Sequence, residues 1–139
     1  MSARGKARRR ALDILFEADA REEAPLDVLA QHQQRRIEMG NPNLNDYTVE
    51  LVSGVADHRG EIDDLVNGAA IGWTIERMPA VDRATLRVAV WELRYSDEVP
   101  AAVAISEAVA AARELSTDES PRFVNGVLSA IAAPAVEGP

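Results

Sequence analysis

The chain has 139 residues, a mass of 15.1 kDa and a net charge of −8, and this length predicts one domain with a hydrophobic core of its own. It has no cysteine, which excludes disulfide bonds, thiolate zinc sites and cysteine nucleophiles. No apolar run approaches the roughly 18 residues of a membrane span, and the N-terminus lacks a signal-peptide pattern. We therefore expect a cytoplasmic protein with no membrane partner.

The charges are unevenly distributed along the sequence. The first ten positions contain no acidic residue, whereas the rest of the chain has ten basic residues against 23 acidic ones. The sequence thus predicts a basic N-terminal end attached to an acidic body. The five basic residues of this end are Arg4, Lys6, Arg8, Arg9 and Arg10.

Hydrophobic periodicity predicts an all-α fold of about seven helices, because apolar residues recur every three to four positions and no stretch alternates as a strand would. The segment 39–45 is rich in Gly, Asn and Pro and is the best internal break. We expect the tail 134–139 to fray. The first five predicted helices run over about 7–21, about 25–36, from 46 through Val55, from Ile62 to Ala69, and over 81–95, with a short turn at 75–78. The sixth follows Pro100 and runs through Ala112. The seventh runs through Ile131, with Ser120 as its N-cap and Pro121 as its first helical residue.

Few residues are suited to catalysis or metal binding. His32 and His58 are the only candidates for acid–base chemistry at neutral pH, and neither has a metal-ligand spacing. The acidic residues of 57–64 lack the regular pattern of an EF-hand, and no phosphate-loop, dinucleotide or serine-nucleophile motif occurs. We therefore expect neither an enzyme nor a metal or cofactor site.

The basic N-terminal cluster is a candidate site for nucleic-acid phosphates. Its residues are expected before and within the first turn of a helix, where positive charges oppose the helix dipole. A bound anion would relieve this repulsion, and the unpaired N–H groups of the helix start also favour phosphate. The alternative is a disordered basic leader without function.

The start of the last predicted helix is a second candidate. If the apolar stripe of 124–131 faces the core, Phe123 and Asn125 lie about 100° to either side of it and Arg122 points nearly opposite. An aromatic ring beside an arginine can stack on an unpaired base and hold its phosphate, which favours single strands. Alternatively, Phe123 packs against a neighbouring helix and Asn125 makes a hydrogen bond between helices.

Three segments resemble the NusB family of transcription antitermination factors, in the family's order and at its spacings. They are residues 4–16 (RGKARRRALDILF), residues 73–93 (WTIERMPAVDRATLRVAVWEL), and the pair VPAAVAISEAV and SPRFVNGVL within 99–128. The sequence departs from the usual pattern at Ser106, where the family has Asn or Asp, and at Gly5, which interrupts the basic run.

The resemblance implies two small helical bundles, here about 1–58 and about 59–134, within a single domain of 1–139. It also implies a non-enzymatic role in antitermination of ribosomal RNA operons. Family members bind the boxA element of nascent RNA together with ribosomal protein NusE and then join NusA, NusG and RNA polymerase. An acidic body suits a basic ribosomal protein as partner.

The resemblance implies roles for the individual residues that match the family's motifs. Phe16 and Asp82 match positions that face NusE. The positions that would contact RNA are Arg4, Lys6 and Arg8 in the basic cluster, which also holds Arg9 and Arg10, and Ser120, Arg122, Phe123 and Asn125 at the start of the last helix.

An enzyme and an interaction module are the two alternatives to this interpretation. A similar helical domain precedes the catalytic domain of ribosomal RNA cytosine-5 methyltransferases, but that chemistry requires a cysteine and a cofactor-binding domain, which this chain lacks. The other is a helical protein–protein interaction module or a homodimer without specific RNA recognition.

Overall fold

Seven α-helices and one short 3₁₀ turn make up the computed structural model of this protein, which describes residues 2–133. The all-α prediction is confirmed, and the fraying predicted for 134–139 lies outside the described residues. No helix of the described range is long and apolar enough to cross a membrane. In chain order the elements are α1 (Ala3–Arg21), α2 (Pro25–Glu38), α3 (Asp46–Asp57), α4 (Arg59–Ala69), the turn η1 (Ile75–Arg77), α5 (Ala80–Tyr95), α6 (Ala101–Leu115) and α7 (Ser120–Ala132).

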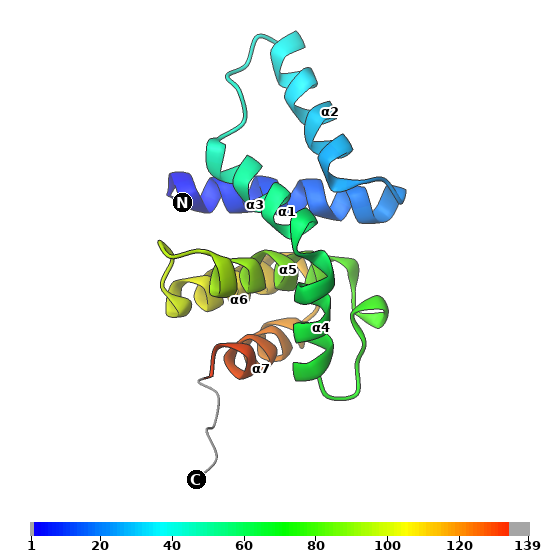
Figure 1. The fold of residues 1–139 in the computed structure, drawn as a ribbon, viewed down its shortest axis with the longest axis vertical. Helices are drawn as coiled ribbons and strands as arrows, with labels where there is room; N and C mark the ends of the chain where they lie inside the picture. Colours follow the sequence, from blue (N-terminus) through cyan, green and yellow to red (C-terminus); the bar gives the residue numbers. More distant parts are fainter. Residues whose placement is uncertain (1, 134–139) are drawn as a thin grey trace.

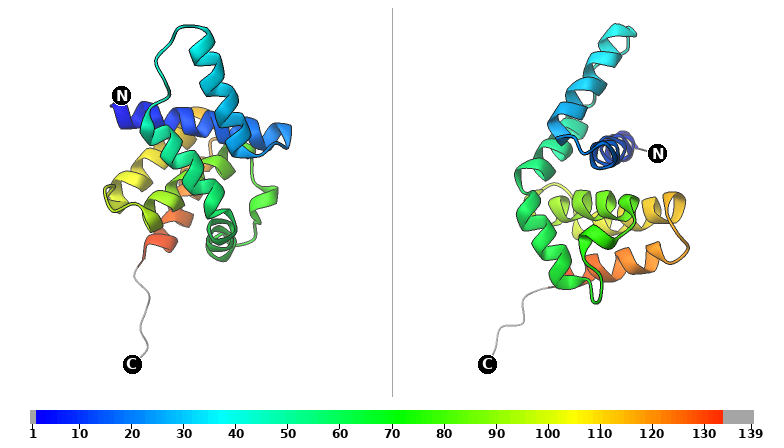
Figure 2. Two further views of the ribbon diagram at one scale, coloured as in Figure 1. Left: turned by 45° about the horizontal axis from the view of Figure 1, so that its top comes forward. Right: turned by 90° about the vertical axis from the view of Figure 1, so that its right-hand side faces the viewer.

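Helix α5 is the centre of the fold. It contacts α1, α3, α4, α6 and α7. In Figures 1 and 2, α1 crosses one side of the α5–α6 pair and α7 covers the opposite side. Apolar side chains from all seven helices form one continuous core cluster. This core spans both predicted sub-bundles, and the division near residue 58 stays a prediction.

Ion pairs reinforce the contact between α1, α4 and α5. The Asp19 carboxylate accepts a 2.9 Å hydrogen bond from Arg83 Nε and lies 3.6 Å from Arg87 and 3.5 Å from Arg59. Arg87, which is buried, also forms a pair of hydrogen bonds with Asp63. Burial alone would raise the pKa of Asp19, but the Arg83 hydrogen bond and the three nearby guanidinium charges hold it below its ordinary value.

A close helix contact places α3 against α5. A Cβ atom added at Gly54 would lie 2.1 Å from Nε1 of Trp91, so no larger residue fits without displacing the indole. This contact holds α3 where the Tyr47 hydroxyl, in its first turn, donates to Glu92 of α5.

Helix α2 buries few of its apolar residues. Leu26 and Ile37 recur at helical spacing as an apolar face would require, but both are exposed, and Val28 is the only fully buried residue of this helix. The reason is visible in Figure 1, where α2 projects away from α5 and only its beginning lies against α1. Periodicity alone does not reveal how much of a helix finds a neighbour.

Candidate nucleic-acid interface

All five basic residues of the N-terminal cluster lie inside α1 rather than partly before it. The helix begins at Ala3, four residues earlier than predicted, because the Ser2 hydroxyl accepts a hydrogen bond from the Gly5 N–H and caps the helix. Successive helical residues point in different directions, so the cluster divides into three groups with different surroundings.

Arg8 points inward and is part of a buried ion pair. Its Nε atom donates to both carboxylate oxygens of Glu92 at 3.0 and 2.9 Å, and the two side chains are only 8% and 1% exposed. The Tyr47 hydroxyl donates to the same carboxylate. Burial, and then the hydrogen bond with Glu92, raise the pKa of Tyr47, which therefore stays a donor. Arg8 thus joins α1 to α5 and is withdrawn from the accessible surface on which an RNA contact was predicted.

Arg4 and Arg9 are more exposed, and each is paired with a carboxylate. Arg4 Nη2 lies 3.1 Å from Glu98, and its guanidinium lies 4.9 Å from the centre of the Tyr47 ring. Arg9 forms two parallel hydrogen bonds with Glu114, at 3.2 and 2.7 Å. The Glu114 hydrogen bond raises the pKa of Arg9, and the Arg9 hydrogen bond lowers the pKa of Glu114.

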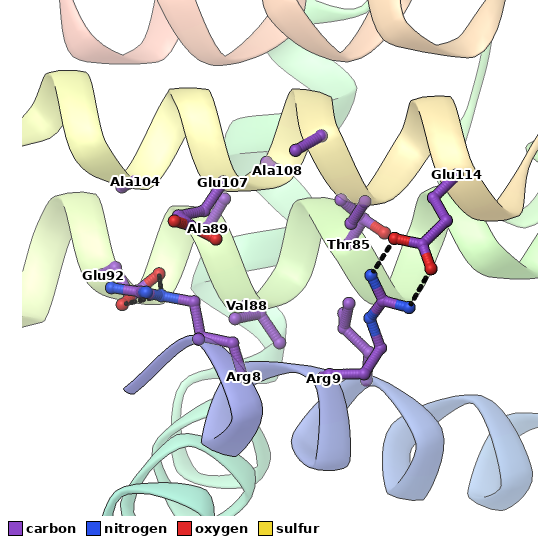
Figure 3. A pocket seen from close by; sticks show the side chains of 14 residues that line it. Arg8, Arg9, Thr85, Val88, Ala89, Glu92, Ala104, Glu107, Ala108 and Glu114 are labelled. Atoms are coloured by element: carbon purple, nitrogen blue, oxygen red, sulfur yellow. Dashed lines mark hydrogen bonds and ion pairs between the residues drawn. The ribbon is translucent and has the colours of Figure 1, made fainter. Parts of the chain in front are cut away.

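Figure 3 shows how Arg8 and Arg9 diverge from α1. Arg8 turns toward Glu92, while Arg9 reaches Glu114 on α6. Between α1, α5 and α6 lies a cavity of about 100 Å³. Arg8 and Thr85 line it, and each has a buried polar atom without a protein hydrogen-bond partner. The cavity is large enough for water to satisfy both atoms.

Lys6 and Arg10 form the outer basic face of α1. They are four residues apart and therefore neighbours on one side of the helix. Both are exposed, and neither forms an ion pair with any residue between 2 and 133. Two like charges four residues apart on a helix repel each other, so this face attracts an anion.

The start of α7 differs from its predicted capping. Ser120 is the first helical residue and not the N-cap, so Pro121 is the second helical residue. Glu119 takes the cap position and makes no side-chain capping bond. The Ser120 hydroxyl donates instead to Oδ2 of Asp82 at 2.8 Å. The same hydroxyl oxygen lies 2.9 Å from the Ser116 hydroxyl and 2.8 Å from the Thr117 hydroxyl, so side chains on both sides of it fix its position.

Burial also changes the interpretation of Asp82. Asp82 and Ser120 are both buried, although both line a groove at the start of α7. Phe16, the other position predicted to face NusE, is 41% exposed on α1. Of the two predicted partner contacts, the structure leaves Phe16 accessible and places Asp82 beneath the start of α7.

Phe123 and Trp73 share an apolar groove at the start of α7. Their ring centroids are 6.5 Å apart at an interplanar angle of 58°. The groove measures about 460 Å³ and includes Met78 and Pro79. Phe123 is partly buried against the core, yet it also lines the groove, so packing and ligand contact are compatible. Trp73 was not singled out as a site residue, although it is the aromatic partner of Phe123.

A second groove lies between α6 and α7 and is more polar. It is lined by Arg122 and Asn125, as well as by Arg113, which sequence reasoning missed. Arg113 and Arg122 are exposed and make no ion pair within residues 2–133. Arg113 gave no sequence signal because a basic residue in the last turn of a helix is ordinary.

The two histidines occupy structural positions. His32 forms a 3.1 Å hydrogen bond with Glu17, and the His58 ring stacks on Tyr95 at 3.9 Å between centroids. Within the described part of the chain, no group of three or more His, Cys, Asp or Glu residues is arranged to hold a metal ion.

Comparison with known proteins finds similarity over nearly the whole chain. A model described as the NusB family matches residues 5–133. The transcription antitermination protein NusB of Arthrobacter sp. (strain FB24) is 54% identical over 128 residues, which cover 92% of this chain and 91% of the relative. The solved structure of T. maritima NusB has a TM-score of 0.81 and 28% identity, covering 95% of this chain and 92% of that one. A crystal structure of antitermination factors NusB and NusE in complex with dsRNA has a TM-score of 0.77 and 28% identity, covering 93% of this chain and 94% of that one.

Proposed function

The chain belongs to the NusB family of transcription antitermination proteins, and we propose that it acts by binding boxA RNA of ribosomal RNA operons together with ribosomal protein NusE. In this proposal it is a cytoplasmic adaptor without a catalytic step of its own. The bound pair then joins NusA, NusG and the elongating RNA polymerase.

The observation that carries the RNA proposal is the outer basic face of α1. Lys6 and Arg10 stay unpaired within the described residues although the chain has 23 acidic residues. Two exposed cations one helical turn apart are suited to phosphate, which contributes affinity without sequence preference.

Base recognition is assigned to the start of α7. Phe123 offers a ring for stacking in the groove that it shares with Trp73, and the exposed Asn125 amide can bond to a base edge. Arg122 supplies a phosphate contact beside them. Arg8 positions α1 through Glu92, and Ser120, which lines the same groove as Phe123, positions the start of α7 through Asp82.

NusE as partner is supported by the acidic body and by the solved complex of NusB and NusE with RNA, which has the same fold. Phe16 is the exposed apolar residue proposed to face NusE. Asp82 contributes by holding Ser120, and thereby the start of α7, in place.

The test is a titration of fluorescein-labelled boxA RNA, a scrambled strand and a boxA duplex, with and without NusE, at two salt concentrations. We expect preference for single-stranded boxA, tighter binding with NusE, and a steep loss of affinity as salt rises. Weak binding that ignores both sequence and NusE would contradict the proposal and favour a helical interaction module.

Phe123→Ala tests the base contact in the same assay. Losing one stacked base is expected to lower boxA affinity by about 1–3 kcal/mol and to bring it closer to that of the scrambled strand. Thermal unfolding of the variant checks that the core contact of Phe123 is not the cause. If a folded variant keeps full boxA preference, the stacking role is wrong.

A further inference from the structure

The pair formed by Arg9 and Glu114 differs from the other ion pairs of α1 in geometry and exposure. Its two hydrogen bonds are parallel, with Nη1 and Nη2 each facing one carboxylate oxygen at 3.2 and 2.7 Å. Glu114 is 61% exposed, whereas Arg9 is 25% exposed. The carboxylate therefore covers the end of the guanidinium from the solvent side.

This geometry is the one in which arginine binds phosphate. A guanidinium presents two N–H groups in a rigid fork, and two oxygens of a phosphodiester fit that fork as two carboxylate oxygens do. In the protein without RNA, Glu114 thus occupies the position on Arg9 that a backbone phosphate would take.

Glu114 contacts one of the two proposed RNA-binding regions and is next in sequence to a residue of the other. Through Arg9 it touches α1, which carries the outer basic face. Its neighbour in sequence, Arg113, lines the groove with Arg122 and Asn125. A strand that contacts both regions would run past the end of α6, where the negative charge of Glu114 would repel it unless that carboxylate moved aside.

We propose that Glu114 is a phosphate surrogate, which occupies Arg9 in the free protein and is displaced by a phosphate when single-stranded RNA binds, and that it thereby sets the RNA affinity. This inference rests on the proposed function. It adds an acidic residue that determines the RNA affinity. It also makes Arg9, rather than Arg8, the arginine of α1 that exchanges a carboxylate for a phosphate.

The exposure of the two pairs explains why only one is exchangeable. An exposed ion pair contributes little to stability and opens at small cost. The Arg8–Glu92 pair is buried, so opening it would leave two charges without water or partner. Because the hydrogen bond from Arg9 lowers the pKa of Glu114, the carboxylate stays ionised at neutral pH and the exchange requires no proton.

The experiment compares Glu114→Gln with Glu107→Gln in titrations of boxA RNA by the full-length protein. Glu107 is an exposed carboxylate of the same helix that lines the same cavity but forms no ion pair within residues 2–133, so its variant reports the change in net charge alone. We expect Glu114→Gln to bind RNA about two- to fivefold more tightly than Glu107→Gln at low salt, with the difference shrinking as salt rises.

A double-mutant cycle with Arg9→Ala completes the test. If Glu114 acts by covering Arg9, then Glu114→Gln in the Arg9→Ala background gains no more affinity than Glu107→Gln does. An equal gain in both backgrounds, no gain over Glu107→Gln, or weaker binding by Glu114→Gln would each overturn the inference. In those cases the unaltered protein still binds boxA selectively, whereas failure of the proposed function would appear as loss of that selectivity in the unaltered protein itself.

Discussion

The inner and outer faces of α1 contain the same kind of side chain in different surroundings. Arg8, on the inner face, meets the buried carboxylate of Glu92, and the pair connects α1 to the central helix. Lys6 and Arg10, on the outer face, meet solvent. A basic cluster in sequence is therefore not a binding site as a whole, because some of its charges build the fold and others are available to a ligand.

The largest effect is expected from Arg8→Ala. Glu92 would be left charged and buried with only Tyr47 as partner, so the free energy of unfolding should fall by about 3–5 kcal/mol in urea denaturation. Lys6→Ala should change it by less than about 0.5 kcal/mol, because Lys6 is exposed.

A second variant keeps this prediction testable if Arg8→Ala does not fold. Combining Arg8→Met with Glu92→Gln removes both charges, while the oxygen of the new side-chain amide can still accept from Tyr47, so this double variant should be more stable than Arg8→Met alone. If the double variant is as unstable as the single one, the charge pair is not what makes Arg8 important.

An intermediate effect is expected at Asp19, near the other end of α1. Asp19→Asn loses the charge that pairs with Arg83, so the free energy of unfolding should fall by about 2 kcal/mol at neutral pH. Because folding lowers the pKa of Asp19, its contribution is present above the unfolded value of about 4 and is lost as pH falls through the folded value.

The measurement is urea denaturation of Asp19→Asn and the unaltered protein between pH 7 and pH 3. The difference between them should shrink at the acidic end. Asp64→Asn is the matched control, since Asp64 is exposed on α4 and makes no ion pair within residues 2–133. A difference that is constant with pH would contradict the ion-pair explanation.

The smallest effect on stability and the clearest effect on RNA are expected at the outer basic face. Lys6→Ala combined with Arg10→Ala should leave thermal unfolding nearly unchanged, weaken binding to boxA and scrambled RNA alike, and reduce the salt slope by about 1.4 for two lost single-strand phosphate contacts. Arg35→Ala with Arg94→Ala removes the same charge elsewhere. If that control lowers the slope equally, overall charge rather than this face controls binding.

Local sequence patterns predicted most of the fold. Apolar spacing located the helices now labelled α3 to α7 within a few residues, and Pro25 marked the first residue of α2. The errors came where tertiary contacts compete with local rules. Ser120 has the residue type of an N-cap, but it is the first helical residue and its hydroxyl donates to Asp82 on α5. The apolar residues Leu26 and Ile37 are exposed, because α2 projects away from α5.

The candidate site was predicted in composition but not in detail. The basic cluster and the start of the last helix were both identified from sequence, and both lie on elements that the structure describes. Trp73, Arg113 and Glu114 were not assigned to the site. Each belongs to it only through a residue distant in sequence or on another helix, such as Phe123 for Trp73 and Arg9 for Glu114.

The sequence by itself determined that this protein is helical, acidic apart from a basic N-terminal end, and similar to the NusB family, because periodicity, charge and motif spacing are properties of neighbouring residues. Only the tertiary structure decided which of five adjacent cations are accessible. That outcome depends on carboxylates contributed by α5, the loop after it and α6, whose distance from α1 in space is unrelated to their distance in sequence. An arginine that pairs with a buried carboxylate is itself buried, and an arginine that pairs with an exposed carboxylate is covered reversibly. A cation with no carboxylate nearby stays available for RNA.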